Sequence, residues 1–285
     1  MNNEIERMKK YILIYKNEFQ GKINIKDDVK FGVEIEFTTY NHKPIKSDLK
    51  NTGYEFVRDG SGVAIFEAIS PILHNKEEDW LKLKNVLNII NNHDSKLTSR
   101  EGGHIHYDQN ILDKNNIDSF LKLWYCFENI IYTFSYGDFY NARYSEFLYA
   151  KKLHKEIEQR LKDRYYEYFD KDYGLNLSNI FGDFKFFAPE TYEVRCPNAT
   201  LNITTWQNNV LFFARLFAFA NDKSNKNFID SLYNDGIKEN NFENAYYLAS
   251  LIFDNKDDIL SFLKQYSHID GKFLVKENQK KKIRI

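Results

Sequence analysis

Three short stretches of the chain carry ionisable side chains at every second position. They are Glu34 and Glu36; His104, His106 and Asp108; and Glu193 and Arg195. This alternation is typical of β-strands, in which residues i and i+2 share one face. If the strands are neighbours in one sheet, their carboxylates lie about 4.8 Å apart and their repulsion requires a counter-ion. Taken singly, each stretch also fits an ordinary solvent-facing strand, and His104 could simply pair with Asp108.

A fourth stretch places Asp59 and Glu67 on either side of a glycine-rich connection. A turn centred near Val63 would bring the two carboxylates opposite each other, about 5 Å apart. A tighter turn within residues 60–62 would separate them, and an ordinary hairpin with a polar Asp-Gly turn is the alternative. The Gly-Ser-Gly sequence is not followed by a helix, so it does not predict a phosphate-binding loop.

A set of four or five carboxylates with one or two imidazoles is rich in oxygen. Such a set suits Mg²⁺ or Mn²⁺ and the phosphates that these ions carry, whereas zinc would require more nitrogen or sulfur ligands. Arg195 lies two residues after Glu193 and can hold a phosphate oxygen from the same face. This combination suits phosphoryl transfer from ATP, in which positioning and charge neutralisation dominate catalysis.

The stretches FGVEIEF, DGSGVAIFEAISP, GGHIHYD and TYEVRCPNATLN occur in this order over roughly residues 31–217. Together they resemble the amidoligase family, which is related to the catalytic domain of glutamine synthetase and to the glutamate–cysteine ligases. The resemblance implies ATP-dependent amide formation, in which ATP phosphorylates a carboxylate and an amine attacks the acyl phosphate. It also implies a sheet curved around a funnel that holds several Mg²⁺ or Mn²⁺ ions.

The resemblance assigns roles to individual residues. One metal ion would be held by Glu36, Asp59 and Glu67, and another by Glu34, His104 and Glu193. The residues expected to bind the nucleotide are His106, Arg195 and Asp108. The residues expected to act in catalysis are Arg195, Arg143 and Glu67. The glycines before His104 would let phosphate or nucleotide approach the backbone.

The chain departs from its relatives at several positions. Asp59 stands where they often have Glu, so it reaches less far. Thr191 stands where they often carry another arginine, which leaves a phosphate or nucleotide contact unassigned. Arg143 could supply this contact or bind the substrate carboxylate, and a surface salt bridge is the alternative. Asn176 falls where the family tends to have a substrate-side asparagine, although turns also favour Asn.

The elements that must position these residues follow from periodicity. Helices are predicted at about residues 4–19, 77–91, 117–135, 145–169, 203–220 and 225–266. The helix at 203–220 would open with a capping box of Thr204 and Gln207. Strands separate long helices without a regular βαβ rhythm, which predicts an α+β fold with a mainly antiparallel curved sheet and helices packed on its outer face.

The same patterns suggest three parts. These are an N-terminal helical extension at 1–25, a glutamine synthetase-like catalytic domain at 26–222, and a C-terminal helical region with a basic tail at 223–285.

Composition limits the partners. The 40 basic and 41 acidic residues nearly cancel, so no overall field directs the chain to nucleic acid or to an anionic membrane. Two cysteines are too few for a disulfide framework. Residues 1–19 lack the apolar core of a signal peptide, and VLFFARLFAFA is too short to span a bilayer.

We therefore expect a cytoplasmic, ATP-dependent amidoligase that uses Mg²⁺ or Mn²⁺ and acts on small-molecule, peptide or protein carboxylates and amines. The alternatives are a zinc hydrolase built on the His-x-His strand and a catalytically silent nucleotide-binding protein.

Overall fold

The structure, a computed structural model, describes residues 2–60, 64–97, 101–136, 153–163, 173–182 and 190–268. The helices are α1 (Asn2–Ile14), α2 (His42–Leu49), α3 (Glu77–Asn92), α4 (Ile117–Ser135), α5 (His154–Asp163), α6 (Ser178–Phe181), α7 (Ile203–Asn221), α8 (Lys226–Asn234), α9 (Phe242–Ile252) and α10 (Lys256–His268). The strands are β1 (Lys30–Thr38), β2 (Glu55–Arg58), β3 (Ile65–Ile69), β4 (Leu73–His74), β5 (Gly103–Asp108), β6 (Leu175–Asn176) and β7 (Thr191–Val194). Short 3₁₀ turns lie at Gln109–Ile111, Lys114–Asn116 and Lys223–Asn225.

Within the described part of the chain, the seven strands form one sheet in the order β2-β3-β1-β5-β7-β6, with β4 paired to the start of β1. All of these pairings are antiparallel. The register sets Glu36 opposite Glu67, Glu34 opposite His104, and His106 opposite Glu193. We call the surface that carries these six residues the polar face of the sheet. The predicted α+β class with an antiparallel sheet is confirmed.

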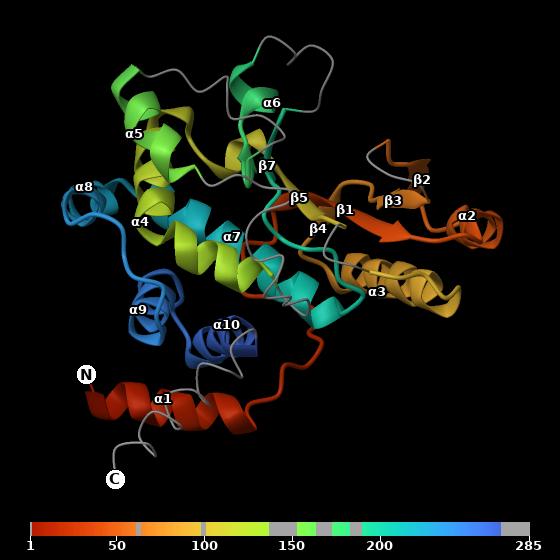
Figure 1. Cartoon of the computed structure of the whole chain (residues 1–285), viewed down its shortest axis with the longest axis horizontal. Coiled ribbons are helices and arrows are strands. Elements are labelled where there is room, and N and C mark those ends of the chain that lie inside the picture. The colour runs from red at the N-terminus through yellow and green to blue at the C-terminus, as the bar shows by residue number, and fades with distance from the viewer. Residues whose placement is uncertain are drawn as a thin grey trace.

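The opposite face of the sheet is apolar and packs on helices (Figure 1). Its residues Val33, Ile35, Ile105 and Val194 are at most 1% exposed. Helix α7 covers β5, where the Tyr107 hydroxyl donates to the Val210 carbonyl at 2.8 Å. Helix α3 covers the start of β1 through ring contact between Trp80 and Phe31. Each fully buried large apolar side chain contributes about 1.5–3 kcal/mol to the stability of the fold. This packing therefore fixes which residues remain on the polar face.

The helices at the two ends of the described chain pack on each other, and Figure 1 shows α1 beside α10. The Tyr15 hydroxyl and the Ser261 hydroxyl are 3.0 Å apart, and Lys264 donates to the Ile12 carbonyl at 3.1 Å. Met8 and Ile12 belong to the same buried cluster as the apolar strand residues. Both terminal regions therefore join the core next to the sheet, and the three-part division of the chain stays a prediction.

Helices α3 and α4 begin at the predicted residues, whereas α1 ends at Ile14, before the predicted Phe19. Helix α7 is capped differently from the prediction. The Asn202 side chain accepts the Thr204 amide at 2.9 Å, because Asn directly before the first turn is already a good cap. The amide of Gln207 instead donates to the Gln20 carbonyl at 2.6 Å. None of the described helices combines the length and the apolar character needed to cross a membrane.

Candidate metal centre

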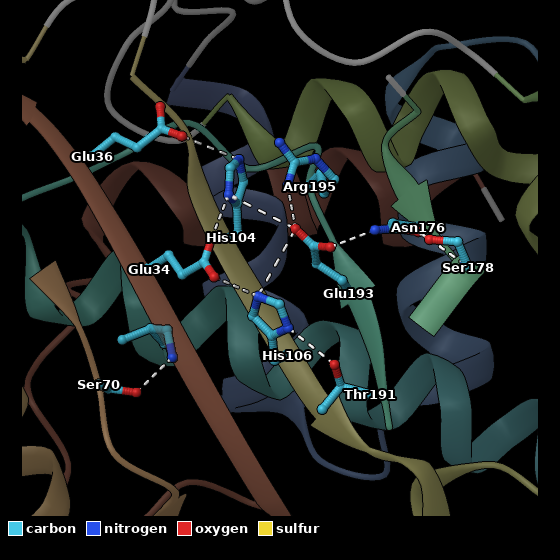
Figure 2. A network of polar contacts seen from close by, with 11 residues as sticks. Glu34, Glu36, Ser70, His104, His106, Asn176, Ser178, Thr191, Glu193 and Arg195 are labelled. Carbon is cyan, nitrogen blue, oxygen red and sulfur yellow. Dashed lines mark hydrogen bonds and ion pairs between the residues drawn. The ribbon is translucent and has the colours of Figure 1, made fainter. Parts of the chain in front are cut away.

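The polar face gathers carboxylates and imidazoles from several strands into one place. In Figure 2, Glu34 and Glu36 project from β1 toward the histidines of β5, and Glu193 of β7 meets them from the other side. The strand pairings produce this arrangement, because residues directly opposite each other on antiparallel strands have Cβ atoms about 5 Å apart. The three charged stretches of the sequence thus lie together in the fold.

His104 lies between two glutamates of β1. Its Nδ1 is 3.0 Å from Glu34 Oε2 and its Nε2 is 3.7 Å from Glu36 Oε1, and the residue is only 5% exposed. The ring rests on Gly102, where a Cβ would stand 2.4 Å from Nε2. At Gly103 a Cβ would stand 2.7 Å from the Asn198 carbonyl oxygen. Both glycines therefore make room for groups of the protein itself, in addition to any ligand.

His106 lies beside Glu34 and Thr191. Its Nε2 is 2.9 Å from Glu34 Oε1, and its Nδ1 is 3.1 Å from the Thr191 hydroxyl. The Thr191 hydroxyl thus fixes the orientation of the ring. Asp108 accepts a hydrogen bond from the Asn110 amide at 2.9 Å, and His104 contacts Glu34 instead. The alternative of a His104–Asp108 pair is therefore wrong.

Glu193 is 4% exposed and accepts hydrogen bonds from two neighbours. The Asn176 amide donates to Oε2 at 2.6 Å, and the Arg195 guanidinium donates to Oε1. Asn176 in turn accepts the backbone amide of Ser178 at 2.9 Å and its hydroxyl at 2.6 Å, which fixes the orientation of the Asn176 amide group. Asn176 therefore contacts a candidate metal ligand directly.

The charges on the polar face perturb one another. Burial opposes ionisation of Glu34, but hydrogen bonds from His104 and His106 outweigh burial and hold the pKa of Glu34 well below its usual range. Burial also opposes the charged form of His106, but its hydrogen bond to Glu34 and the charge of Glu193 outweigh burial and raise the pKa of His106. These residues form an ionic cluster in which the imidazoles offset the carboxylates.

At Glu36 and Glu67 burial and repulsion outweigh the favourable contacts. Burial raises the pKa of Glu36 despite the nearby His104. Burial and repulsion from Glu34 and Glu36 raise the pKa of Glu67 to about 7. A cation placed among these groups would remove the repulsion.

Among the described residues, two sets of side chains bring ligand atoms within 4.8 Å of one another. We call Glu36, Asp59 and Glu67 the carboxylate cluster, and Glu34, His106 and Glu193 the mixed cluster. The carboxylate cluster contains the three residues expected to share an ion, and its hard oxygen donors fit a cation such as Mg²⁺. The mixed cluster contains His106 where the resemblance implied His104, and its nitrogen and oxygen donors also fit a divalent ion.

The register of β2 and β3 differs from the predicted turn. Val57 stands opposite Glu67, and the Asp59 amide donates to the Ile65 carbonyl at 3.1 Å. Asp59 and Glu67 are therefore diagonal rather than directly opposite neighbours. Their carboxylates still meet, because both residues lie on the polar face and long side chains bridge a diagonal of about 7 Å.

A pocket of about 460 Å³ opens beside the mixed cluster, at the end of the sheet where β1 begins and β5 ends. We call it the edge pocket. Its walls include the apolar residues Ile69, Pro71 and Ile72 and the backbone of Phe31 and Val33, whose side chains are buried on the opposite face of the sheet. Glu34, His106, Asp108 and Thr191 supply polar groups, and Lys30 lies at the same end of the sheet. Its volume is in the range of pockets for small molecules and cofactors.

Sequence reasoning missed most of the pocket wall. Ser70-Pro71 predicted only the end of a strand, and neither Lys30 nor Glu190 belongs to a recognisable motif. The available signal was the continuation of the β1 alternation to Lys30 and Gly32, which places both residues on the polar face. Arg143, to which catalysis or phosphate binding was assigned, lies outside the described residues.

A family profile described as "putative amidoligase enzyme" matches residues 49–217, which is more than half of the 285 residues. The matched stretch carries Asp59, Glu67, both histidines of β5 and Glu193, and it begins after Glu34 and Glu36. No curated protein matches the chain.

Gly102→Ala is expected to weaken Mn²⁺ binding at least ~10-fold, because the methyl group would displace the His104 ring from Glu34 and Glu36. Gly102 does not need a left-handed backbone, so the variant should fold. Gly60→Ala is the matched control, since a Cβ there meets nothing within 4 Å. Calorimetric titration with Mn²⁺ measures the effect, and equal affinities in the two variants would contradict it.

Glu67→Gln is expected to stabilise the metal-free protein at pH 8. The Glu67 carboxyl titrates near pH 7 when folded and near 4.5 when unfolded, so its ionisation costs stability as pH rises through this window. The gain should be about 1 kcal/mol after allowance for solvent screening, and should vanish at pH 4.5 and below. Urea denaturation in EDTA measures it, with exposed Glu55→Gln as the control. An equal gain in stability at pH 8 and at pH 4.5 would contradict the explanation by burial and charge repulsion at Glu67.

Proposed function

The chain belongs to the amidoligase family, and we propose that it is an ATP-dependent ligase that joins a carboxylate to an amine. The observation that carries the proposal is the arrangement on the polar face. Two clusters of metal-ligand groups share β1, where Glu34 and Glu36 are two residues apart, and the mixed cluster opens into the edge pocket. ATP with divalent ions needs this combination of a nucleoside pocket and adjacent carboxylates.

The edge pocket suits the nucleoside part of ATP. Its apolar walls can contact a base and ribose, and its size is adequate for them. His106, at the inner end of the pocket beside Glu34, would then lie by the phosphates, as would Asp108 and Lys30 through ions or water. The phosphates would point from the pocket toward both clusters, which agrees with the roles that the resemblance assigns to His106 and Asp108.

Metal ions held by the two clusters would neutralise the phosphate charges when bound. Carboxylates of β1 and β3 would position these ions, and Arg195 would offset charge on the transferred phosphoryl group. The Arg195 guanidinium is already fixed on the polar face by its contact with Glu193. Its fork of N–H donors suits phosphate oxygens, so a phosphate could replace part of this contact.

The proposed reaction has two steps. A carboxylate oxygen of the first substrate forms a bond to the γ-phosphorus of ATP while the bond from that phosphorus to ADP breaks. The amine nitrogen then bonds to the acyl carbon, and inorganic phosphate leaves with the electron pair of the C–O bond and the proton of the amine. The residues of the polar face bind, orient and neutralise charge in both steps.

A nucleotide-binding protein without turnover remains the main rival, and the mixed nitrogen and oxygen donors would also suit a zinc hydrolase. A ligase releases ADP and phosphate only when carboxylate and amine are both present. A silent binding protein releases neither product with any pair of substrates. A hydrolase would contain stoichiometric zinc and act without ATP.

Calorimetry with ATP tests the metal dependence. The native protein and Glu55→Gln should bind ATP with Mg²⁺ but not with EDTA, whereas Glu67→Gln should bind at least ~10-fold more weakly, because it loses one carboxylate of an ion site. Glu55 is a suitable control since it lies on exposed β2 outside both clusters. Circular dichroism checks folding. ATP binding that needs neither Mg²⁺ nor Glu67 would rule out the proposed site.

Gly32→Val tests the edge pocket without removing a polar group. Gly32 lies opposite His106 in the pocket wall, and a Cβ there would meet only Ser70 Oγ at 3.5 Å and His106 Cβ at 3.9 Å. The valine should therefore fill pocket space and weaken ATP binding at least ~10-fold while Mn²⁺ affinity in the absence of nucleotide stays within about twofold. Unchanged ATP affinity in the folded variant would place the nucleotide elsewhere.

A further inference from the structure

A second cavity lies next to the edge pocket and away from the metal-ligand groups. It is bounded by the segment that leads into β1, by the 3₁₀ turn after β5 and by the last two turns of α7. Lys30 and Asp108 line both cavities, so the two are neighbours. We call the second cavity the helix pocket. Its volume of about 420 Å³ is in the range of small-molecule sites, and no residue of either cluster lines it.

Part of the wall of the helix pocket is apolar. Ile25, Val29 and Ile111 are half-buried residues that pack against the core, and α7 contributes Ala214 and Ala218. Because the two alanines are four residues apart, they lie one turn apart on the same side of the helix. Longer side chains at these positions would occupy the hollow space. The wall can therefore contact an aliphatic group of a ligand.

The rest of the wall carries charges of both signs. The acidic residues of the wall are Asp28, Asp108 and Asp222, and the basic residues are Lys26, Lys30 and Arg215. Two of these six are engaged by neighbours. Arg215 donates to the Ile252 carbonyl at 3.1 Å and pairs with Asp254, and Asp222 accepts the Ser224 amide at 2.9 Å. The other four are two aspartates and two lysines.

These four side chains keep capacity for a ligand. Among the described residues, no side chain forms a hydrogen bond or an ion pair with Lys26, Asp28 or Lys30. Asp108 receives both of its hydrogen bonds from Asn110 on the same oxygen, Oδ1. The Oδ2 oxygen of Asp108 can therefore accept a donor from a ligand.

The balance of charge indicates the class of ligand. An anion alone would be repelled by the two aspartates, and a cation alone would be repelled by the two lysines. A molecule with one ammonium and one carboxylate group satisfies both signs, since the ammonium can donate to aspartate while the carboxylate accepts from lysine. An amino acid or a short peptide with free ends has these two groups.

We propose that the helix pocket binds a zwitterion with an aliphatic side chain, namely a free amino acid or a short peptide. The aliphatic side chain contacts the wall of Ile25, Val29 and Ile111, and the charged groups meet the aspartates and lysines. This site is separate from the clusters of the polar face. It goes beyond the proposed function, because binding there requires neither ATP nor a metal ion.

Calorimetry of the native protein, in EDTA and without nucleotide, tests the proposal. L-leucine and L-alanyl-L-leucine are the probes, and at least one of them should bind with one molecule per chain. Tighter binding of leucine identifies a site for free amino acids, and tighter binding of the dipeptide identifies a peptide site. N-acetyl-L-leucinamide, which has the side chain without the charges, should bind at least ~10-fold more weakly. No binding of either probe at about 10 mM, or equal binding of the uncharged compound, would overturn the proposal.

Two adjacent carboxylates provide a matched pair of variants. Asp28→Asn should weaken binding of the better probe at least ~3-fold, because the ammonium loses a charged partner. Asp27→Asn is the control, since Asp27 pairs with Lys22 at 2.9 Å and does not line the helix pocket. Equal affinities in the two variants would overturn the assignment of the ammonium to this wall.

A substitution that fills the helix pocket locates the ligand. Ala218 is exposed, so Ala218→Leu should fold and should weaken binding of the better probe at least ~10-fold by occupying the space. Ser231→Leu is the control, because Ser231 is exposed on α8 and lines neither cavity. Gly32→Val, which narrows only the edge pocket, should leave the affinity for the probe within about twofold. Unchanged affinity in folded Ala218→Leu would overturn the proposal, whatever the result with ATP.

Discussion

Like charges are crowded on one face of a sheet whose other face is buried, and this constraint governs the site. Strand periodicity puts Glu34 and Glu36 on the same side of β1, and burial of Val33 and Ile35 prevents the strand from turning them away from their neighbours. The carboxylates therefore cannot relax apart. Burial together with this repulsion raises the pKa of Glu67, while hydrogen bonds from His104 and His106 lower the pKa of Glu34.

The orientation of the charged side chains depends on uncharged residues next to them. Gly102 leaves space for the His104 ring, Thr191 holds the outer nitrogen of His106, and Asn176 holds one oxygen of Glu193. Each contact comes from a neighbouring strand or from the start of the same strand. Thr191 therefore sets the orientation of an imidazole through an uncharged contact.

Much of this arrangement could be predicted because it follows from alternation along single strands. The charged and apolar faces of β1, β5 and β7 follow directly from Glu34-x-Glu36 and its counterparts, and α3 and α4 follow from helical spacing. Pairing order and side-chain direction could not be predicted, because they depend on contacts between distant segments. The resemblance assigned His104 to a metal ion and His106 to the nucleotide, whereas the fold turns both rings toward Glu34. The edge pocket could not be predicted for the same reason, because its lining residues Lys30, Ile69 and Thr191 come from three separate strands.

His104 stands between the two clusters, and its chemistry links them. A neutral imidazole has one proton to share between Glu34 on one side and Glu36 on the other. A cation drawn to Glu36 would make that glutamate a poorer acceptor for the ring, while an ion beside Glu34 needs the ring to keep its proton on the opposite nitrogen. An ion at either position would therefore alter the affinity of the other position by an equal factor. If ions bind at both positions, their order of loading would depend on which ring nitrogen of His104 carries the proton.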